Sequence, residues 1–235
     1  MNRDWLFGVV LSLVALVGLA LSGCGPKTYN DGAYKGISQA DGAGYTIAEV
    51  TVQKDKITAV KLTDVTELGA EKDYGTDPWP QAKEANTEMA KRFVGKKDTK
   101  GIDAYSGATG SSKKYIEAVS FALEKGRKTP TVKSTYFDGT FFGKSRAGEQ
   151  GYGVAWVTIK GDKITAVKLD DVTEKNVFKD WITYLYPKAL EAKDAMQKSF
   201  VEKNSATVDA FVGATSGSTK WMEAVANALA NAKVR

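Results

Sequence analysis

Alternating apolar and polar residues mark the stretch 44–67, which reads GYTIAEVTVQKDKITAVKLTDVTE. The alternation is interrupted by the polar sequence QKDK, and period-two patterns on both sides of such a break predict a β-hairpin. Its buried face is predicted to contain Val50, Val52, Ile57, Val60 and Leu62. The stretch 151–174, GYGVAWVTIKGDKITAVKLDDVTE, repeats the pattern around KGDK and predicts a second hairpin.

Helical periodicity follows each hairpin. Ala85, Met89 and Phe93 recur four residues apart after Pro80, which predicts a helix that begins near this proline. A last helix is predicted for residues 111–126, where Ile116, Val119 and Leu123 form the apolar stripe, and for residues 217–232. Short strands are predicted for 32–38 and 139–145.

These elements occur twice, at an offset of 107 residues through the hairpins and the first helices and of 106 from the segment before the last helices onward, and the segment DKITAVKL is identical at 55–62 and 162–169. We therefore predict an α+β protein of two tandem homologous domains, each an antiparallel sheet with helices packed on it. The predicted domains are residues 24–129 and 130–235, after a leader at 1–23. The segment GRKTPTV at 126–132 joins them as a hinge or as a fixed connector.

Composition removes several kinds of redox and catalytic centre. The 235 residues include no histidine and one cysteine. A Cys/His zinc site, a cysteine-ligated iron–sulfur cluster, a covalent haem and a Ser-His-Asp triad are therefore excluded, and no metal ligands are predicted. The net charge is +5, but basic and acidic residues are interspersed, so a nucleic-acid partner is not expected.

The amino terminus carries an apolar run from Trp5 to Leu21, directly followed by Ser22, Gly23 and Cys24. Leu-Ser-Gly-Cys resembles the lipobox of bacterial lipoproteins. The resemblance implies cleavage before Cys24, lipid attachment to its sulfur, and a chain anchored on the extracytoplasmic face of the cell membrane. The alternative is a free buried cysteine at the end of an anchor helix.

Two similar segments precede the last helices, DAYSGATGSS at 103–112 and DAFVGATSGS at 209–218. Ser111 and Ser112 are candidates to cap the first of these helices. A Gly-containing loop before a helix leaves backbone N–H groups free for an anion, which places a phosphate at Thr109 and Thr215. Ordinary caps and turns are the alternative interpretation.

The residues Asp103, Ser106, Gly107, Ala108 and Thr109 form an Asp-x-x-Ser-Gly-Ala-Thr pattern that resembles the flavinylation motif of FMN-binding domains. Such domains occur in the Rnf complex, in the sodium-translocating NADH:quinone reductase and in Gram-positive lipoproteins of extracellular electron transfer. In that family a flavin transferase uses FAD to link FMN, through its phosphate, to the last threonine of the motif.

The resemblance implies a covalent FMN on Thr109 and another on Thr215. It also implies that the transferase recognises Asp103 and Asp209, and that Gly107-Ala108 and Gly213-Ala214 shape the turn. Val212 stands where the motif has Ser or Thr. Further candidates near the flavin are Tyr105, Phe211, Trp79, Tyr186, Glu67 and Glu174. Core packing, a helix-start staple or a strand-end turn also explains these six residues.

The resulting hypothesis is a membrane-anchored electron carrier that relays electrons from a membrane dehydrogenase or quinol-linked donor to an extracytoplasmic acceptor. No substrate-specific catalytic residue is predicted. Two alternatives stay open: a solute-binding lipoprotein that holds a phosphorylated ligand non-covalently, and a flavin reductase of a small acceptor such as fumarate or a quinone. Arg92 and Arg146 are present, but no Arg cluster for a carboxylate substrate stands out.

Overall fold

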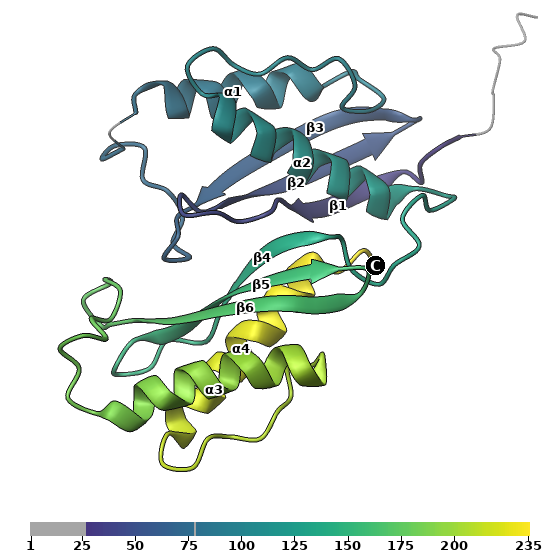
Figure 1. Ribbon diagram of the computed structural model, residues 1–235. Helices are drawn as coiled ribbons and strands as arrows, with labels where there is room; N and C mark the ends of the chain where they lie inside the picture. The colour runs from purple at the N-terminus through teal and green to yellow at the C-terminus, as the bar shows by residue number, and fades with distance from the viewer. Residues whose placement is uncertain (1–26, 78) are drawn as a thin grey trace, which may run out of the picture.

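The computed structural model describes residues 27–77 and 79–235, so the leader and Cys24 lie outside the described residues. The first unit contains β1 (Gly32–Ile37), β2 (Tyr45–Gln53), β3 (Lys56–Val65), α1 (Gln81–Phe93) and α2 (Thr109–Gly126). The second contains β4 (Gly139–Lys144), β5 (Tyr152–Lys160), β6 (Lys163–Val172), α3 (Pro187–Lys203) and α4 (Thr215–Ala232). Figure 1 shows the two sheets lying between the two pairs of helices.

Each unit has one antiparallel sheet, ordered β1-β2-β3 or β4-β5-β6, as the α+β expectation requires. The hairpins turn at Lys54-Asp55 and at Gly161-Asp162, and all four residues have positive φ, as a two-residue type I′ turn demands. Asp55 has a second role, because its carboxylate accepts the backbone N–H groups of Thr28 and Tyr29. Desolvation opposes ionisation of Asp55, but these donors and Lys97 outweigh it and lower its pKa to about 2.

The predicted core positions are mostly buried. Val50, Val52, Ile57 and Leu62 are buried, whereas Val60 is half-buried against the same cluster. The α1 residues Ala85, Met89 and Phe93 are fully buried. On α2, Val119 is fully buried and Leu123 is almost completely buried. Ile116 is only half-buried, and the largest α2 side chain in the core is Tyr115 instead.

The second sheet is covered on its inner face and partly covered on its outer face. Its inner face packs on α3 and α4, and its outer face carries Phe142 and Trp156, which pack against Tyr45 and Leu68 of the first unit. The aligned positions in the first unit are Lys35 and Glu49, and both are exposed. The two units therefore do not contact each other through equivalent faces.

The connector is fixed by hydrogen bonds. The Glu124 carboxylate accepts the backbone N–H groups of Thr131 and Val132 at 2.6 and 2.9 Å, and the Thr131 hydroxyl as well. The ring of Phe121 on α2 stacks on Phe137 with 3.9 Å between centroids. The segment 126–132 could be a hinge or a fixed connector, and these contacts correspond to a fixed connector.

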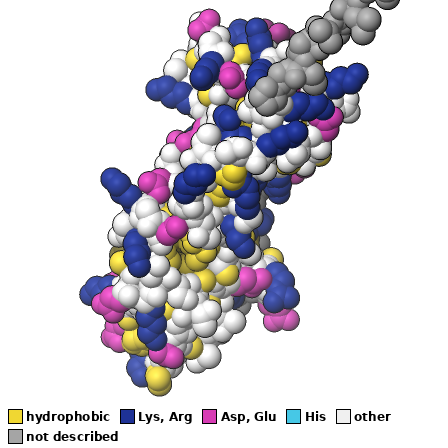
Figure 2. Space-filling view, turned by 90° about the vertical axis from the view of Figure 1, so that its right-hand side faces the viewer, with side chains coloured by type: hydrophobic (Ala, Val, Ile, Leu, Met, Phe, Trp, Pro, Cys, Tyr) yellow, Lys and Arg dark blue, Asp and Glu magenta, His cyan; other side chains and the backbone are white. Residues whose placement is uncertain are grey.

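Charge is distributed over both units. In Figure 2, lysine and arginine side chains are spread over the visible face with acidic side chains between them. Among the described helices, none is long and apolar enough to cross a membrane.

Gly36 on β1 supplies a sharp test of the sheet–helix packing. A methyl group at this position would overlap the carbonyl oxygen of Ala118 on α2. We predict that Gly36→Ala lowers the free energy of unfolding by about 1–3 kcal/mol, the usual cost of overpacking, in urea titrations. Gly42→Ala is the control, because nothing lies within 4 Å of the place that its added methyl group would take, and an equal loss in both variants would contradict the account.

Candidate functional site

The threonines at the end of the two repeated segments are the first residues of the last helices. Thr109 begins α2 and Thr215 begins α4, and both are exposed. The preceding Ala108 and Ala214 are the N-cap residues, with nearly equal φ of −134° and −139°. The same local conformation therefore presents both hydroxyl groups at a helix start.

A β-turn precedes each helix. The Ala108 N–H donates to the Tyr105 carbonyl at 3.1 Å, and the Ala214 N–H donates to the Phe211 carbonyl at 3.0 Å. The third turn residue is Gly107 or Gly213, with φ of +82° and +89°, a region that glycine enters without steric cost. Glycine at these positions is thus required by the turn.

A buried serine locks each turn to its helix. The Ser112 hydroxyl accepts the Tyr105 N–H at 2.9 Å and donates to the Ala108 carbonyl at 2.8 Å. Ser218 makes the same pair of bonds to Phe211 and Ala214, at 3.0 Å each. The expectation that Ser111 and Ser112 cap α2 was wrong, because neither side chain bonds the first-turn N–H groups: Ser112 points back to the turn.

This arrangement leaves the helix start open. Within the described residues, no protein group accepts the backbone N–H groups of residues 109–111 or 215–217. A methyl group at Gly110 would meet nothing within 4 Å, so the approach to α2 is clear of side chains. Free N–H groups and the positive end of the helix dipole together favour an anion such as a phosphate.

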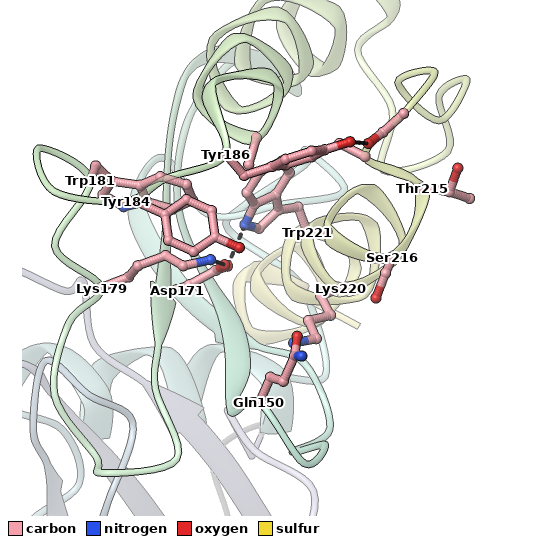
Figure 3. A pocket seen from close by; sticks show the side chains of 14 residues that line it. Gln150, Asp171, Lys179, Trp181, Tyr184, Tyr186, Thr215, Ser216, Lys220 and Trp221 are labelled. Atoms are coloured by element: carbon pink, nitrogen blue, oxygen red, sulfur yellow. Dashed lines mark hydrogen bonds and ion pairs between the residues drawn. The ribbon is translucent and has the colours of Figure 1, made fainter.

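A pocket of about 210 Å³ adjoins Thr215 in the second unit. Figure 3 shows Trp181 and Tyr184 as one wall of it, Thr215 and Ser216 at the start of α4 on the other side, and Tyr186 reaching toward the turn before α4. The Tyr186 hydroxyl donates to the Gly213 carbonyl at 2.8 Å and so ties this wall to the turn. A neighbouring hollow of about 480 Å³ shares Gln150, Asp171, Lys179, Tyr184 and Lys220 with the pocket.

Lys179 is the central cation of this pocket. Its ammonium group lies 3.2 Å from the buried Asp171 carboxylate and 3.8 Å from the Tyr184 ring centroid. Asp171 also accepts the indole N–H of the buried Trp221 at 2.9 Å. A second cation, Lys220, lines the same pocket and has no ion-pair partner within the described chain.

The first unit has a pocket of similar size, about 210 Å³, at the aligned position. Asp64 lies on its wall and accepts the hydroxyl groups of Thr46, Tyr74 and Tyr115 at 2.6–2.8 Å. Burial, and then the charge of Asp64, raise the pKa of Tyr115 well above its usual value, so its hydroxyl stays protonated and donates to the carboxylate.

The two pockets differ in charge. In the first unit Lys72 pairs with Asp77 and Lys114 pairs with Asp41, each at 2.6 Å. The aligned positions of these two acids in the second unit are Tyr184 and Gly148. The pocket beside Thr215 is therefore the more positive of the two.

The remaining predicted residues take different places. Asp103 and Asp209 are exposed; the Asp103 carbonyl accepts from Arg92, and the Asp209 carboxylate pairs with Lys203 at 2.6 Å. Tyr105 and Phe211 pack partly buried against the two cores and line neither pocket.

Trp79 and Tyr186 do line the first and second pocket, respectively. Glu174 lines the larger hollow, whereas Glu67 is half-buried in the turn after β3. Ser106 and Val212 hold the same turn position and both face solvent, Val212 with 86% of its surface exposed. The turn thus forms with either residue.

Several pocket residues were missed from the sequence, chief among them Asp64, Asp171, Lys179, Trp181 and Trp221. Asp64 and Asp171, Lys72 and Lys179, and Tyr115 and Trp221 occupy aligned positions, so the repeat itself held a signal. That signal indicates a shared position but does not say that these strand and helix residues meet at one pocket.

Comparison with known proteins supports a flavin site. Residues 43–124, roughly a third of the chain, match the family model described as FMN-binding domain. No curated protein matches. A protein from Clostridium perfringens with a known crystal structure is 25% identical over 41% of this chain and 88% of its own, with a TM-score of 0.36.

The family match supports an FMN-binding domain in the first unit and FMN as its cofactor. The residues of the site fit this group. The free N–H groups at residues 109–111 suit its phosphate, and a pocket with aromatic, cationic and hydroxyl side chains adjoins them.

Ser112 tests the turn–helix lock. We predict that Ser112→Ala costs about 1–3 kcal/mol of unfolding free energy, because it leaves the Tyr105 N–H without its acceptor. Ser111→Ala is the matched control, since this neighbouring hydroxyl makes no hydrogen bond within the described chain, and it should change stability little. Equal urea midpoints for the two variants would rule out the lock.

Proposed function

We propose that the chain is an electron carrier with two covalently attached FMN groups, one on Thr109 and one on Thr215. The supporting observation is that both threonines occupy the same exposed helix start, each beside open N–H groups and a pocket with aromatic walls. The family match to residues 43–124 supports FMN as the ligand. The second unit carries the same turn, serine lock and helix start.

Attachment is a group transfer by a flavin transferase with FAD as donor. The threonine oxygen bonds to the FMN-side phosphorus, the pyrophosphate bond breaks, AMP leaves, and the hydroxyl proton passes to a base of the transferase. The exposed turn lets an enzyme reach the threonine, because Ser106 or Val212 and Asp103 or Asp209 all face solvent. Once formed, the phosphodiester oxygens accept the free N–H groups.

The bound flavin supplies reversible electron transfer, and the protein supplies position and charge. We further propose that Cys24 carries the lipid that holds the chain on the extracytoplasmic face of the membrane. Electrons enter from a membrane dehydrogenase or quinol-linked donor and leave to an extracytoplasmic acceptor. A covalent bond keeps the cofactor from being lost in that compartment.

Single threonine substitutions test the attachment. In protein co-produced with a flavin transferase, wild type should show twice the in-gel flavin fluorescence, after denaturation, of Thr109→Ala or Thr215→Ala, and the double variant should show none. Thr219→Ala is the control, because this helix residue only bonds back to the Thr215 carbonyl. Flavin lost entirely on denaturation would favour the non-covalent solute-binding alternative. Rapid turnover of one small acceptor by the isolated protein would favour a flavin reductase.

The charge difference between the pockets predicts different potentials. Cations stabilise a reduced, more negative flavin, so the FMN on Thr215 should have the higher midpoint potential of the two. In Thr109→Ala protein, Lys179→Gln should lower the potential of the remaining flavin, measured by spectroelectrochemical titration. Lys175→Gln is the control, since this exposed lysine of the same loop lines neither hollow. An unchanged potential in Lys179→Gln would contradict the electrostatic assignment.

A further inference from the structure

A row of aromatic rings crosses the interface between the two units. The Tyr45 ring stacks on Phe142 with centroids 5.5 Å apart, and Phe142 meets the edge of Trp156 at 5.3 Å. Trp156 in turn lies 6.1 Å from Phe178. All three separations fall within the range of directly interacting aromatic pairs.

One end of the row lines the first candidate site, and the other end lies beside the segment that carries Lys179 into the second pocket, although Phe178 itself does not line that pocket. Tyr45 lines the pocket beside the start of α2. At the other end, Phe178 directly precedes Lys179, the central cation of the second pocket, and its backbone bridges to Val172, next to Asp171. Phe142 and Trp156 are 2% and 9% exposed, so the middle of the row excludes water.

The row exists because the second unit departs from the first. Phe142, Trp156 and Phe178 align with Lys35, Glu49 and Glu71, which are exposed polar residues. In a free unit, aromatic residues on an outer sheet face would leave apolar surface in water. Phe142 and Trp156 lie on the face that contacts the first unit, and the partly exposed Phe178 extends the row from Trp156 toward the second pocket.

We propose that Tyr45, Phe142, Trp156 and Phe178 form the path by which an electron passes between the two FMN groups. This inference rests on the proposed function. One electron leaves the reduced FMN of one unit and reaches the oxidised FMN of the other, and each flavin exchanges its proton with water. No bond to the protein forms or breaks, and no ring of the row is oxidised or reduced: the packed rings serve as the medium for tunnelling.

The test uses the full chain with both FMN groups. A radiolytic pulse of a small one-electron reductant places electrons on either flavin, and the absorbance relaxation that follows in wild type, but not in Thr109→Ala or Thr215→Ala, measures transfer between the sites. Trp156→Leu should slow this relaxation several-fold, and Trp156→Phe, which keeps a ring, should restore most of the rate.

Phe121→Leu is the matched control. Phe121 packs on Phe137 and Phe141 at the same interface, but none of these rings belongs to the row, so this variant should lose comparable urea stability without slowing the relaxation. An equal slowing in Phe121→Leu, or an unchanged rate in Trp156→Leu with an unchanged radius of gyration, overturns the path. Fewer than two FMN per chain removes the proposed function itself, a failure that flavin absorbance distinguishes from the loss of the path alone.

Discussion

The hydrogen bonds of one buried serine in each unit position the whole site. Ser112 and Ser218 hold a glycine turn against the first turn of the last helix. The N-cap residues are Ala108 and Ala214, and neither makes a side-chain capping bond. Thr109 and Thr215 stand exposed beside N–H groups that have no acceptor within the described part of the chain. The site depends on this lock because an anion at a helix start needs donors that the protein has left free.

The two units use the same backbone for different surroundings. Their turns and helix starts agree within a few degrees of φ, but the acids that neutralise Lys72 and Lys114 in the first unit have no counterparts in the second. Likewise, exposed Lys35 and Glu49 align with Phe142 and Trp156, which bury the outer face of the second sheet against the first unit. Substitutions at a few aligned positions thus make the second pocket more positive than the first and create the contact between the two units.

Much of the fold follows from local pattern. Period-two alternation located both hairpins, and Pro80 marked the start of α1, because these signals act over a few residues. The pockets were harder to predict: Asp64 and Tyr115 are 51 residues apart in the sequence and meet only through tertiary packing. Tyr105 and Phe211 show a second limit, since a place inside the repeated segment does not reveal that a ring packs partly buried against the core and does not line the pocket.

The central claim is that both helix-start threonines carry FMN through a phosphoester. Intact-mass and peptide-level mass spectrometry of wild-type protein co-produced with a flavin transferase tests it most directly. The account predicts two FMN additions per chain, each with loss of one water, one on the peptide with Thr109 and one on the peptide with Thr215. An unmodified chain, or an adduct on any other residue, would contradict it.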